Sequence, residues 1–336
     1  MRSMKTATTT ALLLLFASST FAASSKATPC LNVPDAKGCL AGVAMTALAS
    51  EKSAESRTDG YASLLSSLVK AGVRRDDVFA AAINSETAPL LSRWSLAVAR
   101  KAYAQRFSVA EASEDDPGRI EAVADHLRNR PDGLERLFVA FTACEAKEDM
   151  SPAALAEWDG VLDRLCRIKA ADSDALDKMI PGLSAMVAPV IDAYNRDEHA
   201  LRQSLLQSLN TLSGYHALLA ESASAKEREN LRGILAFGHL LTATALATAG
   251  YREGAFKALE TSLGHLRKAP SMATEFQMFF SQASWIYAKA GRRDEASRAI
   301  KESMAKVDRK RSGSGGDRAT DIAIAIETLS LLETTH

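Results

Sequence analysis

The chain has 336 residues, and its 41 basic and 41 acidic side chains give a formal charge of zero at neutral pH. Such a balanced surface lacks the basic footprint of a nucleic-acid-binding protein. The sequence contains neither a G-x-x-x-x-G-K-[ST] loop nor a G-x-G-x-x-G turn, which argues against nucleotide chemistry. The length suits two average domains or one extended array.

The first 22 residues have the three parts of a secretory signal. Arg2 and Lys5 give a positive start, and Ala11–Phe16 forms a short apolar core. The tripeptide TFA, which ends at Ala22, offers small residues at the two positions that a signal peptidase reads. We expect cleavage after Ala22 and an exported protein, periplasmic or extracellular, with a signal of bacterial style. The alternative is a buried N-terminal helix.

The apolar core of the signal is too short for a membrane span, which needs about 20 residues. We find no later stretch that is long and apolar enough, and we expect no transmembrane segment in the mature chain.

Four cysteines follow the predicted signal, and exported proteins commonly pair theirs. Cys30 and Cys39 flank a loop containing Pro and Gly, and we expect a disulfide between them. If Cys144 and Cys166 lay on antiparallel helices with a turn near Asp149, they would be offset by roughly 18 Å along the helix axis. Because a disulfide needs Cα atoms within about 7 Å, this second pair stays open between a bridge and two buried thiols. No C-x-x-C spacing suggests metal ligation.

Apolar residues recur at helical spacing, and strand-period alternation is nowhere convincing, so the predicted fold class is all-α. Gly72, Gly250 and Gly291 each follow a helical pattern and predict helix ends. An acidic stretch at 111–118 predicts a loop. The predicted segments are a signal peptide (1–22), an N-terminal loop (23–37), an N-terminal helical segment (38–112), a middle helical segment (117–195), C-terminal hairpins (197–308), a flexible linker (309–316) and a terminal helix (317–336).

An internal repeat lies near the C-terminus. The stretch AGYREGA at 249–255 matches AGRRDEA at 290–296, which lies 41 residues later, and a third copy of the turn starts at Lys70. The repeat resembles the tetratricopeptide repeat, in which an aromatic residue precedes a glycine turn and a small residue follows at the helix crossing. Here Tyr287, Gly291 and Ala296 take those places.

The resemblance covers mainly 236–307 and, more weakly, 61–83. The spacing exceeds the 34 residues usual in the family, and Leu246 replaces the aromatic in the preceding copy.

The resemblance implies stacked antiparallel helical hairpins, a tetratricopeptide-like α-solenoid, whose concave side binds a peptide or protein. The residues it places on that side are Met278, Ser281, Trp285 and Lys289 in the last full hairpin, and Phe237, Thr244 and Thr248 in the preceding one. Trp285 could instead belong to the core. The function expected on this basis is a non-catalytic scaffold of the cell envelope that binds a protein or peptide partner.

No catalytic motif emerges. The histidines at 126, 199, 216, 239 and 265 are scattered, with no H-E-x-x-H pair, so we expect no metal site and no cofactor. Ser-x-x-Lys occurs at Ser67 and Ser303 without its companion motifs. We therefore expect no catalytic residues and a protein that is not an enzyme.

Two alternatives remain. A small-ligand receptor or a cell-wall-acting enzyme would have a pocket in the middle segment. A structural protein would self-assemble through the terminal helix, which is apolar on more than one face and must either be sandwiched in the array or bind a partner. Its apolar residues are Ile322, Ile324, Ile326, Leu329 and Leu331.

Overall fold

The computed structural model describes part of the chain, and within that part every regular element is a helix. This confirms the all-α prediction. The predicted signal peptide, the acidic loop and most of the middle segment lie outside the described residues. The described residues are 26–83, 87–110, 142–144, 146–147, 166, 173–269, 278–309 and 314–334.

The N-terminal part forms a group of helices, two of which begin with a side-chain cap. Asp35 accepts a hydrogen bond from the Gly38 amide, and Ser53 accepts one from the Ser56 amide, which satisfies donors that a helix start leaves free. The elements are η1 (Thr28–Asn32), α1 (Ala36–Ala49), α2 (Ala54–Lys70), α3 (Asp76–Ala81) and α4 (Leu90–Phe107).

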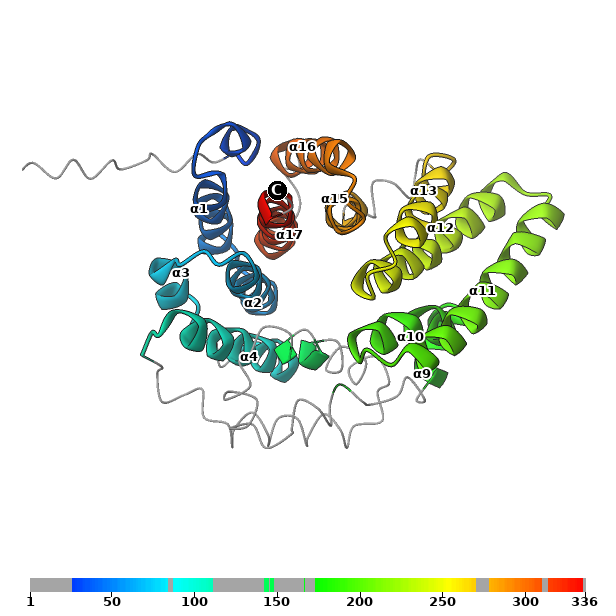
Figure 1. Cartoon of the computed structure of the whole chain (residues 1–336), viewed down its shortest axis with the longest axis horizontal. Helices are drawn as coiled ribbons and strands as arrows, with labels where there is room; N and C mark the ends of the chain where they lie inside the picture. Colours follow the sequence, from blue (N-terminus) through cyan, green and yellow to red (C-terminus); the bar gives the residue numbers. More distant parts are fainter. Residues whose placement is uncertain are drawn as a thin grey trace, which may run out of the picture.

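The C-terminal part is also built of helices, the longest of which exceed those of the N-terminal part (Figure 1). Helices α12 and α13 pack along each other, as do α15 and α16. The elements are α9 (Ser173–Met179), α10 (Leu183–Tyr194), α11 (Glu198–Glu221), α12 (Ala225–Thr248), α13 (Arg252–Leu266), α15 (Met278–Lys289), α16 (Arg293–Arg309) and α17 (Gly315–Thr334).

The three copies of the glycine turn have the same geometry. Gly72, Gly250 and Gly291 all have positive φ, at 64°, 84° and 76°. The residue after each glycine donates its amide to the carbonyl five residues earlier, at 2.9 Å from Val73 and 2.8 Å from Tyr251 and Arg292. This is the Schellman helix end, in which the left-handed position favours glycine. The repeated sequence signal therefore corresponds to a repeated backbone structure.

The terminal helix α17 lies between the N-terminal helices and the pair formed by α15 and α16 (Figure 1). It packs against α1 and α2 on one side and against α15 and α16 on the other. Of the two predicted outcomes for this apolar helix, the structure shows the first, because helices of the same chain cover it on both sides. The N-terminus is attached to the same region, because Asp308 at the end of α16 accepts the amides of Ala27 and Thr28 at 2.6 and 2.9 Å.

Both cysteine pairs are bridged. The expected disulfide Cys30–Cys39 is confirmed, with Cα atoms 5.4 Å apart. Cys144 and Cys166 form a second disulfide, with Cα atoms 4.8 Å apart, and no free cysteine remains. The expected offset of roughly 18 Å is therefore wrong, because the Cα atoms of Cys144 and Cys166 lie within the reach of a disulfide. The amide of Asn195, at the end of α10, donates to the Cys166 carbonyl at 3.1 Å.

One described helix, α12, is long and apolar enough to cross a membrane, a property that the sequence analysis did not anticipate. Just over half of its apolar window, 56%, is buried inside the protein. It packs against α10, α11, α13 and α15, as the core helix of a helical protein does.

The contact of α17 with α2 gives a first prediction. A Cβ atom on Gly316 would lie 2.0 Å from the Ser56 carbonyl oxygen, whereas one on Gly42 in α1 would meet nothing within 4 Å. We expect Gly316→Ala to lower the free energy of unfolding by about 1–3 kcal/mol, because the two backbones must separate. Gly42→Ala, the matched control, should raise it by up to about 1 kcal/mol. Urea denaturation measures both, and equal effects of the two substitutions would contradict the close contact.

Candidate functional site

The predicted partner-binding residues of α15 lie largely under the terminal helix. Ser281 is 1% exposed, and its hydroxyl bonds with Asp321 of α17 and Ser303 of α16, both at 2.7 Å. Trp285 is 8% exposed, and its indole donates to Glu327 of α17 at 2.6 Å. In this structure, α17 therefore covers the face that the resemblance assigns to a peptide.

The remaining predicted binding residues have more varied positions. Lys289 is half-buried and places its ammonium 5.3 Å from the centre of the Trp285 ring. Gln282 of α15 donates to Thr244 of α12 at 3.5 Å, which places these two faces side by side. Phe237 is half-buried among apolar side chains, and the buried hydroxyl of Thr248 has no hydrogen-bond partner. The side chain of Met278 lies outside the described residues.

Three histidines that are far apart in the sequence meet on α11, α12 and α13. The metal-binding nitrogens of His216, His239 and His265 all lie within 4.8 Å of one another. The Nε2 atoms of His216 and His239 are 3.4 Å apart, and the three ring centres are separated by 5.1 to 5.8 Å. We call these residues the histidine cluster.

Sequence reasoning missed this cluster, although it had noted each histidine. The residues are separated by 23 and 26 positions, so no helix-period motif connects them. Short turns join α11, α12 and α13, and α12 packs against both of its neighbours. One histidine on each helix is thereby placed beside the other two. Of the other histidines considered, His199 lies at an exposed position of α11, and His126 lies outside the described residues.

The electrostatics of the cluster favour neutral imidazoles. Burial, followed by the repulsive charges that His265 and His216 would carry, lowers the pKa of His239 to about 4. Burial also lowers the pKa of His265, followed by the charges of His216, Lys268 and Arg232. Because only the neutral ring has a free nitrogen lone pair, these shifts keep His239 and His265 in the form that binds metal near neutral pH.

The spacing of the cluster fits a transition metal. Zinc–nitrogen bonds of about 2.0–2.1 Å place tetrahedral ligand atoms about 3.3 Å apart, and the His216–His239 separation is 3.4 Å. A separation of 4.8 Å, the widest in the cluster, requires a shift of roughly 1.5 Å, which side-chain rotation supplies. Since His216 is exposed, a fourth coordination position would face solvent.

A cleft lies between α13, α15 and α16 with a volume of about 560 Å³, within the usual range for ligand sites. It is lined by aromatic rings and by charges of both signs, including Glu260, Arg267 and Arg298. Tyr287, the aromatic of the repeat, donates its hydroxyl to Glu260. Arg292 lies 4.2 Å from the centre of the Phe256 ring.

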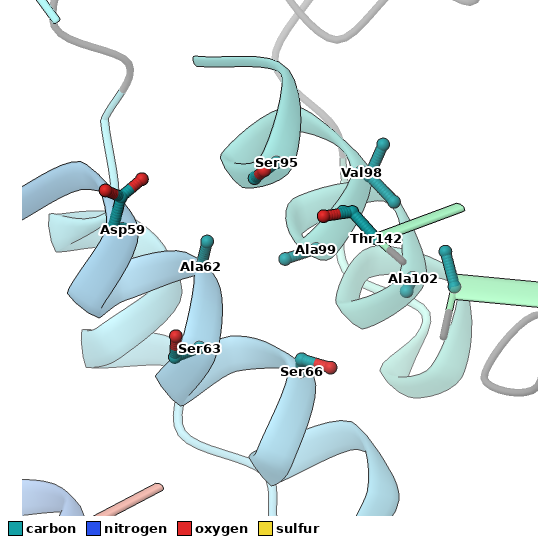
Figure 2. Close-up of a pocket in the computed structure, with 10 residues that line it drawn as sticks. Asp59, Ala62, Ser63, Ser66, Ser95, Val98, Ala99, Ala102 and Thr142 are labelled. Atoms are coloured by element: carbon teal, nitrogen blue, oxygen red, sulfur yellow. The ribbon is translucent and has the colours of Figure 1, made fainter. Parts of the chain in front are cut away.

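A smaller pocket of about 140 Å³ lies between α2 and α4, and Thr142 and Ala146 also line it. Figure 2 shows residues of α2 along one wall and residues of α4 along the opposite wall.

Comparisons with known proteins give no relative. No family model matches the chain. No curated protein and no solved structure matches it either. The resemblance to the tetratricopeptide repeat thus stays a prediction that is based on the sequence of this chain alone.

The histidine cluster predicts how the stability of the metal-free protein depends on pH. The folded pKa of His239, about 4, lies below its unfolded value of about 6.5, so the unfolded state binds the extra proton between these values. The stabilising contribution of the neutral ring is therefore full above pH 6.5 and is lost progressively as the pH falls toward 4. We expect His239→Gln to flatten the fall in unfolding free energy across this window, measured by urea denaturation with a chelator present. His199→Gln should leave the slope unchanged, and identical slopes in all three proteins would contradict the assignment.

Proposed function

We propose that this chain is an exported helical-hairpin protein that binds a divalent transition metal through His216, His239 and His265. The observation that carries the proposal is the approach of three imidazole nitrogens, from three successive helices, to within 4.8 Å of one another. This departs from the sequence-based expectation of a protein without metal or cofactor.

The donor set limits the choice of metal. Imidazole nitrogen suits zinc, copper, nickel and iron, whereas calcium and magnesium prefer oxygen. All four cysteines are held in disulfides, so no thiolate is available to favour a softer ion. Zn²⁺ fits best, because three histidines and one open position form a common four-coordinate zinc arrangement.

The compartment and the site support one another. Two disulfides fit an oxidising compartment, and the signal-like first 22 residues favour export. An open three-histidine site can exchange its ion with solvent or with another ligand, whereas a closed four-residue site holds a structural ion. We infer that the protein captures or presents a metal outside the cytosol.

Zinc titration of the full chain tests the proposal. We expect one Zn²⁺ per chain by calorimetry at pH 7.5 and a rise in melting temperature, because the ion binds only the folded site. His216→Ala should weaken binding at least about 10-fold, since even outer-shell changes at metal sites cost 10- to 100-fold. His199→Ala is the matched control, because it removes another exposed histidine from α11. Absence of binding, or equal weakening by both substitutions, would overturn the proposal.

The cleft favours a second function, which is the binding of a peptide segment of an envelope protein. Its volume of about 560 Å³, its aromatic rings and its mixed charges suit an extended polar chain with apolar side groups. It lies between successive hairpins, close to the face that the family resemblance assigns to a partner. This proposal keeps the scaffold role expected from the sequence and moves the contact from Trp285 to the cleft.

Site-specific photocrosslinking in cells separates the two functions. A photoreactive residue in place of Arg298, an exposed residue lining the cleft, should yield a defined crosslinked protein. The same residue in place of Arg202, which is exposed on α11, serves as the control. A Glu260→Gln change in the cleft should reduce the product, and His216→Ala should leave it unchanged. The same product from both positions would contradict binding in the cleft.

A further inference from the structure

The small pocket between α2 and α4 has a definite chemical character. Asp59, Ala62 and Ser66 come from α2, and they face Ser95, Ala99 and Ala102 of α4 (Figure 2). Asp59 of α2 and Ser95 of α4 stand on opposite walls at one end of this row, and Ser66 lies at the other end. Alanine methyl groups leave the space open, while four hydroxyl-bearing residues and one carboxylate line it.

The carboxylate in this pocket has no opposite charge beside it among the described residues. Asp59 is half-buried and hydrogen-bonds with Ser92, and the charge that acts on it is that of Glu55, which has the same sign. Burial raises the pKa of Asp59. The described residues that line the pocket include neither lysine nor arginine. A partly buried carboxylate without a cation is unfavourable, and a cationic ligand would offset that cost.

A second polar group in the pocket, the Ser95 hydroxyl, lacks a hydrogen-bond partner. Ser95 is 7% exposed, and its hydroxyl oxygen is buried without a hydrogen bond. Since buried polar atoms are nearly always paired in folded proteins, this hydroxyl is a group that a bound molecule could pair with. The Ser95 hydroxyl and the Asp59 carboxylate, which has no cation beside it among the described residues, lie toward the same end of the pocket.

We propose that this pocket binds a small organic ammonium ion, with the ammonium at Asp59 and Ser95 and a short carbon chain along the alanines. An engineered cavity of about 150 Å³ accommodates benzene, so about 140 Å³ admits roughly six non-hydrogen atoms. A hard metal cation fits less well, because calcium takes six to eight oxygen ligands and the pocket offers one carboxylate. A neutral polyol would satisfy the hydroxyls and leave the charge of Asp59 without a partner.

A matched pair of probes tests the proposal on the full chain with its disulfides intact. The probes are 4-amino-1-butanol and 1,4-butanediol, which have equal numbers of non-hydrogen atoms and differ in one charged group. We expect the amine to bind with a dissociation constant of about 1 mM or below, as ligands of this size can, and the diol to bind at least about 10-fold more weakly. Chemical-shift changes in NMR titrations measure both.

Three substitutions locate the binding. Asp59→Asn should remove the preference for the amine, because it keeps the shape and loses the charge. Glu55→Gln, one helical turn away and exposed, should leave the preference in place. Ala99→Leu should abolish binding of both probes by filling the pocket, with circular dichroism as the check on folding. Equal binding of the two probes, an unchanged preference in Asp59→Asn, or no binding near 10 mM would overturn the proposal.

Discussion

The contact between α17 and α2 brings the two ends of the described chain into one core. Gly316 approaches the Ser56 carbonyl so closely that a Cβ atom would not fit, and Ile322 and Ile326 are fully buried against the N-terminal helices. The largest core cluster accordingly contains residues of α1, α2 and α4 together with residues of α16 and α17. A chain of helical hairpins otherwise has two free ends with apolar faces. Here the terminal helix covers both.

This arrangement determines which surfaces are left for function. Because α17 covers Ser281 and Trp285, the face of α15 that the family resemblance would use is occupied from within. The main contacts of α17 are with α1, α2, α15 and α16, and the histidine cluster lies on α11, α12 and α13. The cleft lies where α15 and α16, which pack against α17, meet α13. The candidate sites therefore lie beside the closed core, on surfaces that the terminal helix leaves open.

Local sequence signals were sufficient for the elements and for the nearest contacts. The glycines at 72, 250 and 291 predicted helix ends because a left-handed residue is a property of a few neighbouring positions. The Cys30–Cys39 bridge was predictable for the same reason, since nine positions separate its cysteines. The Cys144–Cys166 bridge and the histidine cluster depend on how distant segments pack against one another. The periodicity of apolar residues within a helix does not determine that packing. Trp285 belongs to the same class, because its burial depends on a helix that begins 30 residues later.

The histidine cluster lies in a part of the fold that no disulfide crosses. Both disulfides join residues that precede α9, so none links α11, α12 and α13. Only five residues of α11 are buried, and Leu206, Leu209 and Leu218 of this helix are about half exposed. A metal held by His216, His239 and His265 would join α11 to its two neighbours through bonds that do not require buried apolar area. Binding of the ion and the packing of α11 against its neighbours should then be coupled in one equilibrium. We therefore expect the solvent exposure of the α11 leucines to decrease when the ion binds.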